Sequence, residues 1–423
     1  MKTQNLLLSK TYQLCLFSLV SYFAVTSIQA AEKTSININQ ALARALVSNP
    51  SLNVFDEDMR KAEAQVLSAS LLINPQLQTE LEDFAGTGVY SGTGNAIYNV
   101  GISQMFRLGG KRRANIDFKT SQKENLRLYY ETQKRNISEQ VGLRFVGVLQ
   151  AQEMQQNRQQ ILKITEESEL MVKTQVDGGR GSSISLNQAE LAVMNARMAY
   201  QTAAQRTKIS RIQLAGLWNQ NEPDFTRVLG SLSTPPAKIP EIEIFLARVP
   251  NHPAVQQAEA VVQVAQKSWR YQRTQRIPNL SLALGYRRDA SVDENAIVLG
   301  ATLPLPLFNR NQGGIANAAA SMDRAEQQQK NTLATLQVKL SQTYSELALS
   351  HMMSRLIETE LMPKARESFK ATEESHRLGR TTYLQLLEAQ RNLTTMLQRR
   401  TEAFAQFHQA RISLEALTGK PLR

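Results

Sequence analysis

The feature that most constrains this 423-residue chain is an internal repeat. Residues near the end of the first half recur 200 positions later, near the end of the second half. The matched residues are Gly179-Arg180, Leu186, Ala189, Arg211-Ile212, Leu214 and Leu217 in the first half, and Gly379-Arg380, Leu386, Ala389, Arg411-Ile412, Leu414 and Leu417 in the second. The starts of the two halves match with a shift of 203, which pairs Asn49-Pro50, Asn74-Pro75 and Leu77 with His252-Pro253, Ile277-Pro278 and Leu280. Self-similarity at this scale predicts two similar structural units related by a pseudo-symmetry axis.

Residues 1–30 have the pattern of a secretory signal peptide. Lys2 and Lys10 supply positive charge, an apolar stretch covers residues 14–25, and the small residue Ala30 precedes the expected cleavage site. A single-pass anchor is the alternative, but the apolar stretch is shorter than the roughly 20 residues that span a bilayer. The one cysteine, Cys15, lies in this segment, so we expect the mature chain to have neither a disulfide nor a thiolate metal site.

Composition favours long helices over a compact core. Aromatic residues make up only 6% of the chain, whereas glutamine, alanine and leucine are abundant. We interpret the formal net charge of +12 as solvated helix surface, because nucleic-acid binding requires clustered lysine and arginine. The tight cluster at 111–113 has no accompanying aromatic platform, so no nucleic-acid partner is predicted.

Four short segments alternate between apolar and polar residues, which is the pattern of β-strands. We expect strands at about 75–84 and 96–106 in the first repeat and at about 278–287 and 296–305 in the second. Such segments of about ten residues are typical of outer-membrane β-barrels, although an ordinary half-buried sheet shows the same alternation. Four strands cannot close a barrel, because these barrels begin at about eight strands; a trimer would supply twelve.

The remainder of each repeat is expected to form a long helical hairpin, which makes the chain mainly α-helical with a small β part. The hairpins cover about 112–218 and 312–418, and heptad spacing of their apolar residues indicates coiled-coil packing. Outgoing helices of roughly 60 residues would reach roughly 90 Å, which suits a chain that crosses a wide compartment. Pro363 is expected to kink the second outgoing helix. The predicted domains are a first repeat at 31–225, a proline-containing linker at 226–240 and a second repeat at 241–423.

The sequence contains no pattern of a catalytic, cofactor or metal site. None of the four histidines has a carboxylate or a second histidine three or four residues further on, so each is interpreted as a surface or packing residue. Phosphate-loop, nucleophile-elbow and dinucleotide fingerprints are missing from the sequence. We therefore predict that the protein is not an enzyme, which disfavours a periplasmic hydrolase or a metal-storage protein. The histidines are His252, His351, His376 and His408.

The turns of the two hairpins could carry function without catalysis. The glycines in Gly179-Arg180 and Gly379-Arg380 permit the chain to reverse, and exposed loop residues often bind partners. Glu388 follows the second turn, and a trimer would place three copies of it around one axis. Rings of carboxylates favour cations and can tune a constriction, although a solvated helix residue is the alternative interpretation.

Three segments resemble the TolC family of trimeric outer-membrane efflux ducts, and the resemblance covers nearly the whole mature chain. The first, Ala43-Arg44-Ala45-Leu46 with Asn49-Pro50, resembles the opening helix of the family. The second resembles its tip motif and consists of Gly379-Arg380, Leu384 and Leu386-Leu387-Glu388-Ala389. The third runs from Pro304 to Gly313 and resembles the strand-to-helix junction of the heavy-metal (cobalt–zinc–cadmium, CzcC-like) branch.

The resemblance implies a homotrimer in which a 12-stranded β-barrel in the outer membrane of a Gram-negative bacterium continues into a long α-helical coiled-coil barrel in the periplasm. It implies a passive export duct for heavy-metal cations that contacts outer-membrane lipid, a periplasmic adaptor and an inner-membrane pump of the resistance–nodulation–division type. A multidrug duct, a type I secretion duct and a soluble periplasmic coiled-coil scaffold are the alternatives. The family's gate positions fall on Gln385 and Glu388, where glutamine replaces a common acid, and its adaptor-docking positions fall on Gly179, Arg180, Gly379, Arg380 and Leu384.

Overall fold

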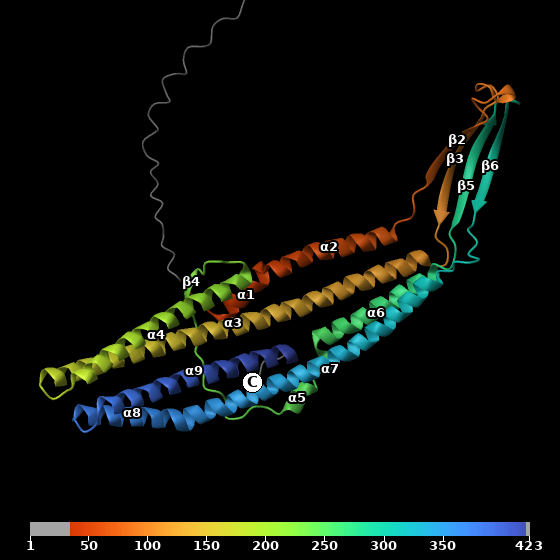
Figure 1. Cartoon of the computed structure of the whole chain (residues 1–423). Coiled ribbons are helices and arrows are strands. Elements are labelled where there is room, and N and C mark those ends of the chain that lie inside the picture. Colours follow the sequence, from red (N-terminus) through yellow and green to blue (C-terminus); the bar gives the residue numbers. More distant parts are fainter. Residues whose placement is uncertain (1–33, 420–423) are drawn as a thin grey trace, which may run out of the picture.

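The computed structural model describes residues 34–419, so the expected signal peptide lies outside the described residues. The chain forms an elongated bundle of long helices with a small sheet at one end (Figure 1). The helices are α1 (Ile38–Ser48), α2 (Pro50–Ser70), α3 (Lys111–Asp177), α4 (Ser183–Ala215), α5 (Ile242–Leu246), α6 (Pro253–Thr274), α7 (Gln312–Leu356), α8 (Met362–Arg377) and α9 (Tyr383–Thr418). The strands are β1 (Thr34–Ile36), β2 (Gln76–Glu82), β3 (Ile97–Phe106), β4 (Phe225–Val228), β5 (Leu280–Asp289) and β6 (Glu294–Thr302).

The larger sheet has four antiparallel strands in the order β2-β3-β5-β6. Each strand overlaps one of the four segments for which the alternating pattern predicts strands, although β5 and β6 each extend two residues further toward the turn that joins them. The central pair joins the two repeats, because β3 belongs to the first and β5 to the second. The backbones approach closely where Gly101 faces Gly285, since a Cβ atom on Gly101 would lie 3.2 Å from the Cα atom of Gly285. A side chain at this position would require the backbone of β5 to shift by a few tenths of an ångström.

The helices next to the sheet follow the same order as the strands. α2 leads into β2, β3 leads into α3, α6 leads into β5, and β6 leads into α7. α2 packs on α3, α3 on α6, and α6 on α7 (Figure 1). α2 and α6 begin at equivalent positions of the repeat, each with a proline in its first turn, where the missing N–H costs no hydrogen bond. The four helices therefore lie side by side in the same order as the four strands to which they connect.

The expected hairpins form from α3 with α4 and from α8 with α9, and apolar side chains pack along them. One buried cluster lies between α1, α3, α4 and β4 and includes Phe145, Leu214 and Phe225. A second lies near the hairpin ends and includes Val172 and Leu386. A third joins α5, α7 and α9. The apolar side chains thus form several small clusters along the length of the molecule, as expected for an elongated chain.

Two local features differ from the expectation. The first residues of the predicted linker form β4, which pairs in parallel with β1 and so belongs structurally to the first repeat. The second outgoing helix contains a π-helical segment, Ile357–Leu361, directly before α8. Pro363 lies at the start of α8 and has no N–H to donate to residue 359, so the helix widens at this point.

Candidate functional site at the hairpin tips

The two hairpin tips have the same backbone geometry. Gly179 and Gly379 have φ angles of 71° and 72°, in the left-handed region that glycine adopts without a steric penalty. The N–H of Arg180 donates to the carbonyl of Gln175 over 2.8 Å, and the N–H of Arg380 donates to the carbonyl of Ser375 over 2.9 Å. Each tip is a Schellman motif, in which such bonds satisfy the last carbonyls of the outgoing helix. The repeated Gly-Arg pair is thus explained by the turn it forms.

Each returning helix begins with a side-chain cap. Ser182 accepts a hydrogen bond from the N–H of Ile184 in the first repeat. In the second repeat Thr382 and Gln385 form a capping box, and Gln385 Oε1 accepts from the N–H of Thr382 over 2.9 Å. Gln385, a predicted gate residue, therefore has a structural task that the sequence motif did not reveal. The signal was present, since threonine followed three residues later by glutamine is the sequence pattern of this cap.

The second predicted gate residue, Glu388, lies one turn further along α9. Gln385 and Glu388 are three residues apart, so they share one face of the helix, and both are exposed. Within residues 34–419, the Glu388 carboxylate has no ion-pair partner. Leu384 is 60% exposed at the same end of α9. The Glu388 and Leu384 side chains are therefore free to meet another subunit or another protein, whereas Gln385 is exposed but already bonded in the capping box.

A groove of about 810 Å³ separates the two tips. Its walls come from both repeats, including Arg180, Ser182, Gly379 and Thr382. The structure thus brings the predicted docking residues Arg180 and Gly379 to one groove. Gly179, Arg380 and Leu384 lie at the tips but do not line it.

Two buried side chains in the wall of this groove were not predicted as functional. His376 and Tyr383 are each 4% exposed, and their rings lie 6.1 Å apart. The His376 Nδ1 atom lies 2.9 Å from the Thr381 carbonyl, while its Nε2 atom and the Tyr383 hydroxyl have no hydrogen-bond partner within the described chain. Burial raises the pKa of Tyr383. Nothing in the sequence pattern distinguishes His376 from a packing residue.

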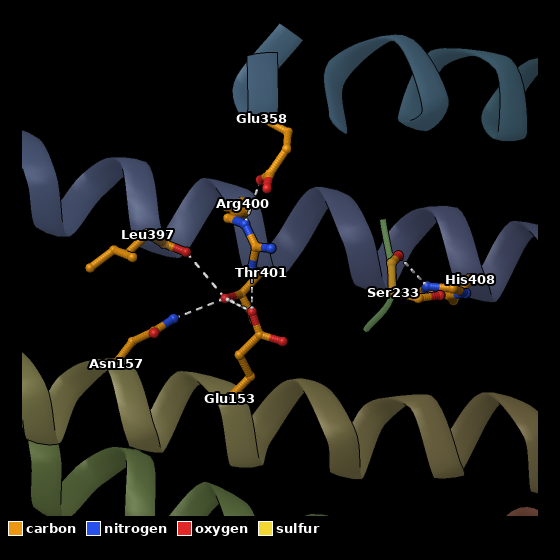
Figure 2. A network of polar contacts seen from close by, with 8 residues as sticks. All are labelled: Glu153, Asn157, Ser233, Glu358, Leu397, Arg400, Thr401 and His408. Atoms are coloured by element: carbon orange, nitrogen blue, oxygen red, sulfur yellow. Dashed lines mark hydrogen bonds and ion pairs between the residues drawn. The ribbon is translucent and has the colours of Figure 1, made fainter. Parts of the chain in front are cut away.

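A polar network fastens the two repeats together away from the tips (Figure 2). The Arg400 guanidinium on α9 contacts Glu153 of α3 at 2.9 Å and Glu358 of the π-helical segment at 2.7 Å. Thr401 bonds to Glu153 and to Asn157 on α3. Both ion pairs are mostly shielded from solvent, since Arg400 is 24% exposed. The network connects three helical elements from both repeats at one level of the bundle.

At the opposite end of the molecule, the sheet presents one apolar face. The strand register places Ile102 of β3 beside Leu284 of β5, and Leu284 beside Leu299 of β6. Side chains on this face are largely uncovered, with Leu77 at 74%, Ile297 at 75% and Leu299 at 79% exposure. The other face carries polar and small residues, among them Gln78, Asn99, Gly101, Gly285 and Gly300. One side of the sheet therefore requires an apolar environment and the other accepts water.

Residues 34–419 lack two kinds of feature. No group of three or more histidine, cysteine, aspartate or glutamate side chains in this part of the chain is arranged to hold a metal ion. Over the same residues, no helix combines the length and apolar character needed to span a membrane.

The arrangement defines the class of protein. A duplicated chain places an apolar-faced sheet at one end and paired hairpin tips about 100 Å away, since a helix of 67 residues rises about 1.5 Å per residue. This is the architecture of an outer-membrane transport protein with a large periplasmic part.

The chain belongs to the outer membrane efflux protein family, whose profile matches residues 41–220 and 249–420. The two matched segments fall within the two repeats. The family, the mainly α-helical repeat architecture and the outer-membrane location predicted from the sequence are confirmed. The family is one of transport proteins.

Individual relatives and structures agree with this assignment. The cobalt-zinc-cadmium resistance protein CzcC of Cupriavidus metallidurans is 26% identical over 385 residues, covering 91% of this chain and 90% of that protein. The nickel-cobalt-cadmium resistance protein NccC of Alcaligenes xylosoxydans xylosoxydans is 26% identical over 315 residues, covering 74% and 70%. A membrane protein from Pseudomonas aeruginosa has the same fold, with a TM-score of 0.77 at 16% identity and 92% coverage of both chains.

Proposed function

We propose that three copies of this chain form a passive duct that exports heavy-metal cations across the outer membrane. The observation that carries the proposal is that the four-stranded sheet has two open edges within the described chain. Within the described chain β2 and β6 have a partner on one side only, and the apolar face between them is exposed. Three such sheets joined edge to edge close into twelve strands, which leaves no open edge and turns the apolar faces outward to lipid.

The cargo is assigned from the names of the relatives. CzcC and NccC are resistance proteins for cobalt with zinc or nickel, and both include cadmium. A divalent cation fits a lining that contains exposed carboxylates, because fixed negative charge raises the local cation concentration. Glu388 on α9, repeated three times around the axis, supplies such charge at the periplasmic entrance, and Gln385 lies beside it as the second gate position.

The energy for export comes from partner proteins in this proposal. A periplasmic adaptor docks at the hairpin tips, through Gly179, Arg180, Gly379, Arg380 and Leu384, and connects the duct to an inner-membrane pump of the resistance–nodulation–division type. The groove between the tips supports this assignment, because it offers an adaptor a concave surface made by both repeats. The trimer, the adaptor and the pump are each separately testable.

The substitution Gly379→Trp tests the docking assignment. No atom lies within 4 Å of a Cβ at this position, so the ring meets no steric clash there, and the positive φ adds a cost of about 1–2 kcal/mol. We expect the variant to form trimers of normal yield but to lose metal resistance in a strain that lacks the chromosomal gene. Lys208→Trp, on an exposed part of α4 away from the tips, is the control. Normal resistance with Gly379→Trp would overturn the docking assignment.

The substitution Glu388→Gln tests the gate. In planar bilayers the unmodified trimer should prefer cations, and the variant should lower the cation-to-anion permeability ratio without changing trimer yield. An unchanged ratio would remove Glu388 from the constriction and leave it as a solvated helix residue.

A further inference from the structure

A pocket lined by arginine lies where the sheet meets the helices. This junction pocket has a volume of about 660 Å³. Arg270 and Arg273 of α6, Arg276 just after α6, and Arg310 before α7 surround it. The other lining residues are Gly109, Thr274, Ile277 and Pro306. The pocket is far from the hairpin tips and takes no part in the proposed gate.

The charge of the junction pocket is uncompensated within residues 34–419. None of its eight lining residues is acidic. Across the described residues 34–419, Arg270, Arg273 and Arg276 form no ion pair and no side-chain hydrogen bond. Arg270 and Arg273 are one turn apart on α6, and like charges at this spacing repel each other. An anion in the pocket would remove this repulsion, and guanidinium groups match the oxygens of a phosphate well.

The pocket is held in shape by local contacts. The Arg310 Nε donates to the Pro306 carbonyl over 3.2 Å, and the Asn311 amide donates to the Gln272 carbonyl over 2.8 Å, which ties the loop before α7 to α6. Gly109 has a φ of 68°, and a Cβ at this position would lie 2.3 Å from the Ile277 side chain. The part of the pocket formed by Gly109 therefore tolerates only glycine. The arginines are therefore presented by a fixed frame.

Apolar side chains flank the junction pocket on the side of the sheet. The loop after β6 exposes Leu305 at 71%, Leu307 at 64% and Phe308 at 90%. Trp269 lies on α6 with the Arg273 guanidinium 4.7 Å from its ring centroid. Tryptophan beside arginine, next to exposed apolar residues, is typical of the boundary between hydrocarbon and headgroups of a membrane. The pocket and its flank thus match an amphiphile with an anionic head.

We propose that the junction pocket binds the phosphate headgroup of an anionic phospholipid in the periplasmic leaflet of the outer membrane. The acyl chains lie along Leu305, Leu307 and Phe308, and the arginines neutralise the phosphate. The proposal rests on the proposed function, because it requires the sheet to lie in the membrane. It anchors the level at which strands give way to helices, independently of what the duct exports.

The test measures lipid near Trp269 in the purified full-length trimer. The chain has two tryptophans, and the other, Trp218, is buried in the first core cluster. Phosphatidylglycerol brominated at shallow acyl positions is titrated into neutral detergent micelles and compared with phosphatidylcholine brominated at the same positions. We expect phosphatidylglycerol to quench the half-buried Trp269 at a roughly tenfold lower mole fraction, given the usual attraction of arginine to anionic lipid surfaces.

The variant that removes the site is Arg270→Gln, Arg273→Gln and Arg276→Gln together. It should quench equally with both lipids, while the matched variant Arg206→Gln, Lys208→Gln and Arg399→Gln, which removes three exposed cations elsewhere, should keep the preference. Equal quenching in the unmodified protein would overturn the proposal. Competition by millimolar inorganic phosphate would assign the pocket to free phosphate and overturn it as well.

A further variant separates lipid from a neighbouring subunit as the partner of the apolar flank. If Leu305→Gln with Phe308→Gln dissociates the trimer and leaves the lipid preference intact, the flank packs on the next subunit and its assignment to the acyl chains is wrong. Trimer mass and metal resistance are measured on every variant, so failure of the lipid site is distinguished from failure of the duct. We expect the arginine variant to remain trimeric.

Discussion

The two repeats reach their tips by different routes. In the first repeat α3 runs without interruption for 67 residues. In the second, the same path is divided into α7 with 45 residues, a π-helical segment with 5 and α8 with 16, a total of 66. The Arg400 network holds this divided helix to α9 and to α3 (Figure 2). The two outgoing paths therefore have nearly the same length, but the second contains a π-helical interruption.

The tips themselves show a second difference. Their backbones are alike, but their packing is not. In the second tip Tyr383 and Leu386 are buried at 4% and 0%, whereas the equivalent Ser183 is exposed and Leu186 is only partly buried. The second tip is thus better packed than the first, although the outgoing helix that supports it is interrupted by the π-helical segment. A better packed tip and an interrupted outgoing helix therefore distinguish the second repeat from the first.

The largest effect that tests this comparison comes from the paired leucines. Leu386→Ala removes a fully buried side chain and should lower the free energy of unfolding by about 2–5 kcal/mol. Leu186→Ala, at the equivalent position, should cost about 1–2 kcal/mol because its side chain is only partly buried. Chemical denaturation followed by helical circular dichroism measures both. Equal losses would mean that the tips are equally packed.

The sequence predicts the repeat and its ends better than its interior. Alternation located the four strands, and Gly179 and Gly379 located the turns, because both signals are local. Pro363 gives rise to a π-helical segment only because the helix continues on both sides of it. The local sequence pattern does not decide whether the helix continues or ends there. The Arg400 network joins residues 153, 358 and 400, and no periodicity connects positions so far apart.

The sequence also predicted some residues of the candidate site and missed others. Exposed tip residues could be placed from the turn and the heptad. The unpartnered atoms of His376 and Tyr383 could not, because burial there depends on how α8, α9 and α3 pack together. Likewise β4 carries too few residues for an alternating pattern, and its pairing with β1 spans almost the whole first repeat.

A smaller effect should follow from breaking the polar network. Arg400→Met leaves Glu153 and Glu358 without their shared partner and should destabilise the fold by about 1–3 kcal/mol. The loss should be local, so amide hydrogen exchange should accelerate in Ile357–Leu361 more than in the matching stretch of α3. Arg144→Met, whose guanidinium bonds to Gln213 on the exposed surface, is the control. Uniform acceleration along both hairpins would contradict a local role of the network at the π-helical segment.

The turns provide a test in which the repeats should behave alike. Gly179→Ala and Gly379→Ala each force a residue with a Cβ into the left-handed region, at a cost of about 1–2 kcal/mol. No atom lies within 4 Å of either Cβ, so packing adds nothing. The two variants should therefore lose the same stability within error, as measured by thermal unfolding. A larger loss at residue 379 would show that the second tip constrains its turn more tightly.

The smallest effect concerns two equivalent helix caps that differ in chemistry. The Asn49 side chain accepts from the N–H of Ser51 to cap α2, and His252 Nδ1 accepts from the N–H of Ala254 to cap α6. Only the second cap can titrate. Burial, helped by Arg135 and Lys339, lowers the pKa of His252 below its ordinary value of 6.5, so the folded chain holds fewer protons than the unfolded chain.

The stabilisation from the His252 cap is therefore complete above pH 6.5 and is lost as the pH falls through that value toward the lower folded pKa. Protonation removes the acceptor, and a lost cap costs about 1 kcal/mol. Hydrogen exchange at the start of α6 should accelerate between pH 7 and pH 5, after correction for intrinsic rates, while the start of α2 stays unchanged. His252→Asn copies the first repeat and should abolish the difference. If acceleration persists in that variant, another group controls the acid response, and the caps of the two repeats are equivalent after all.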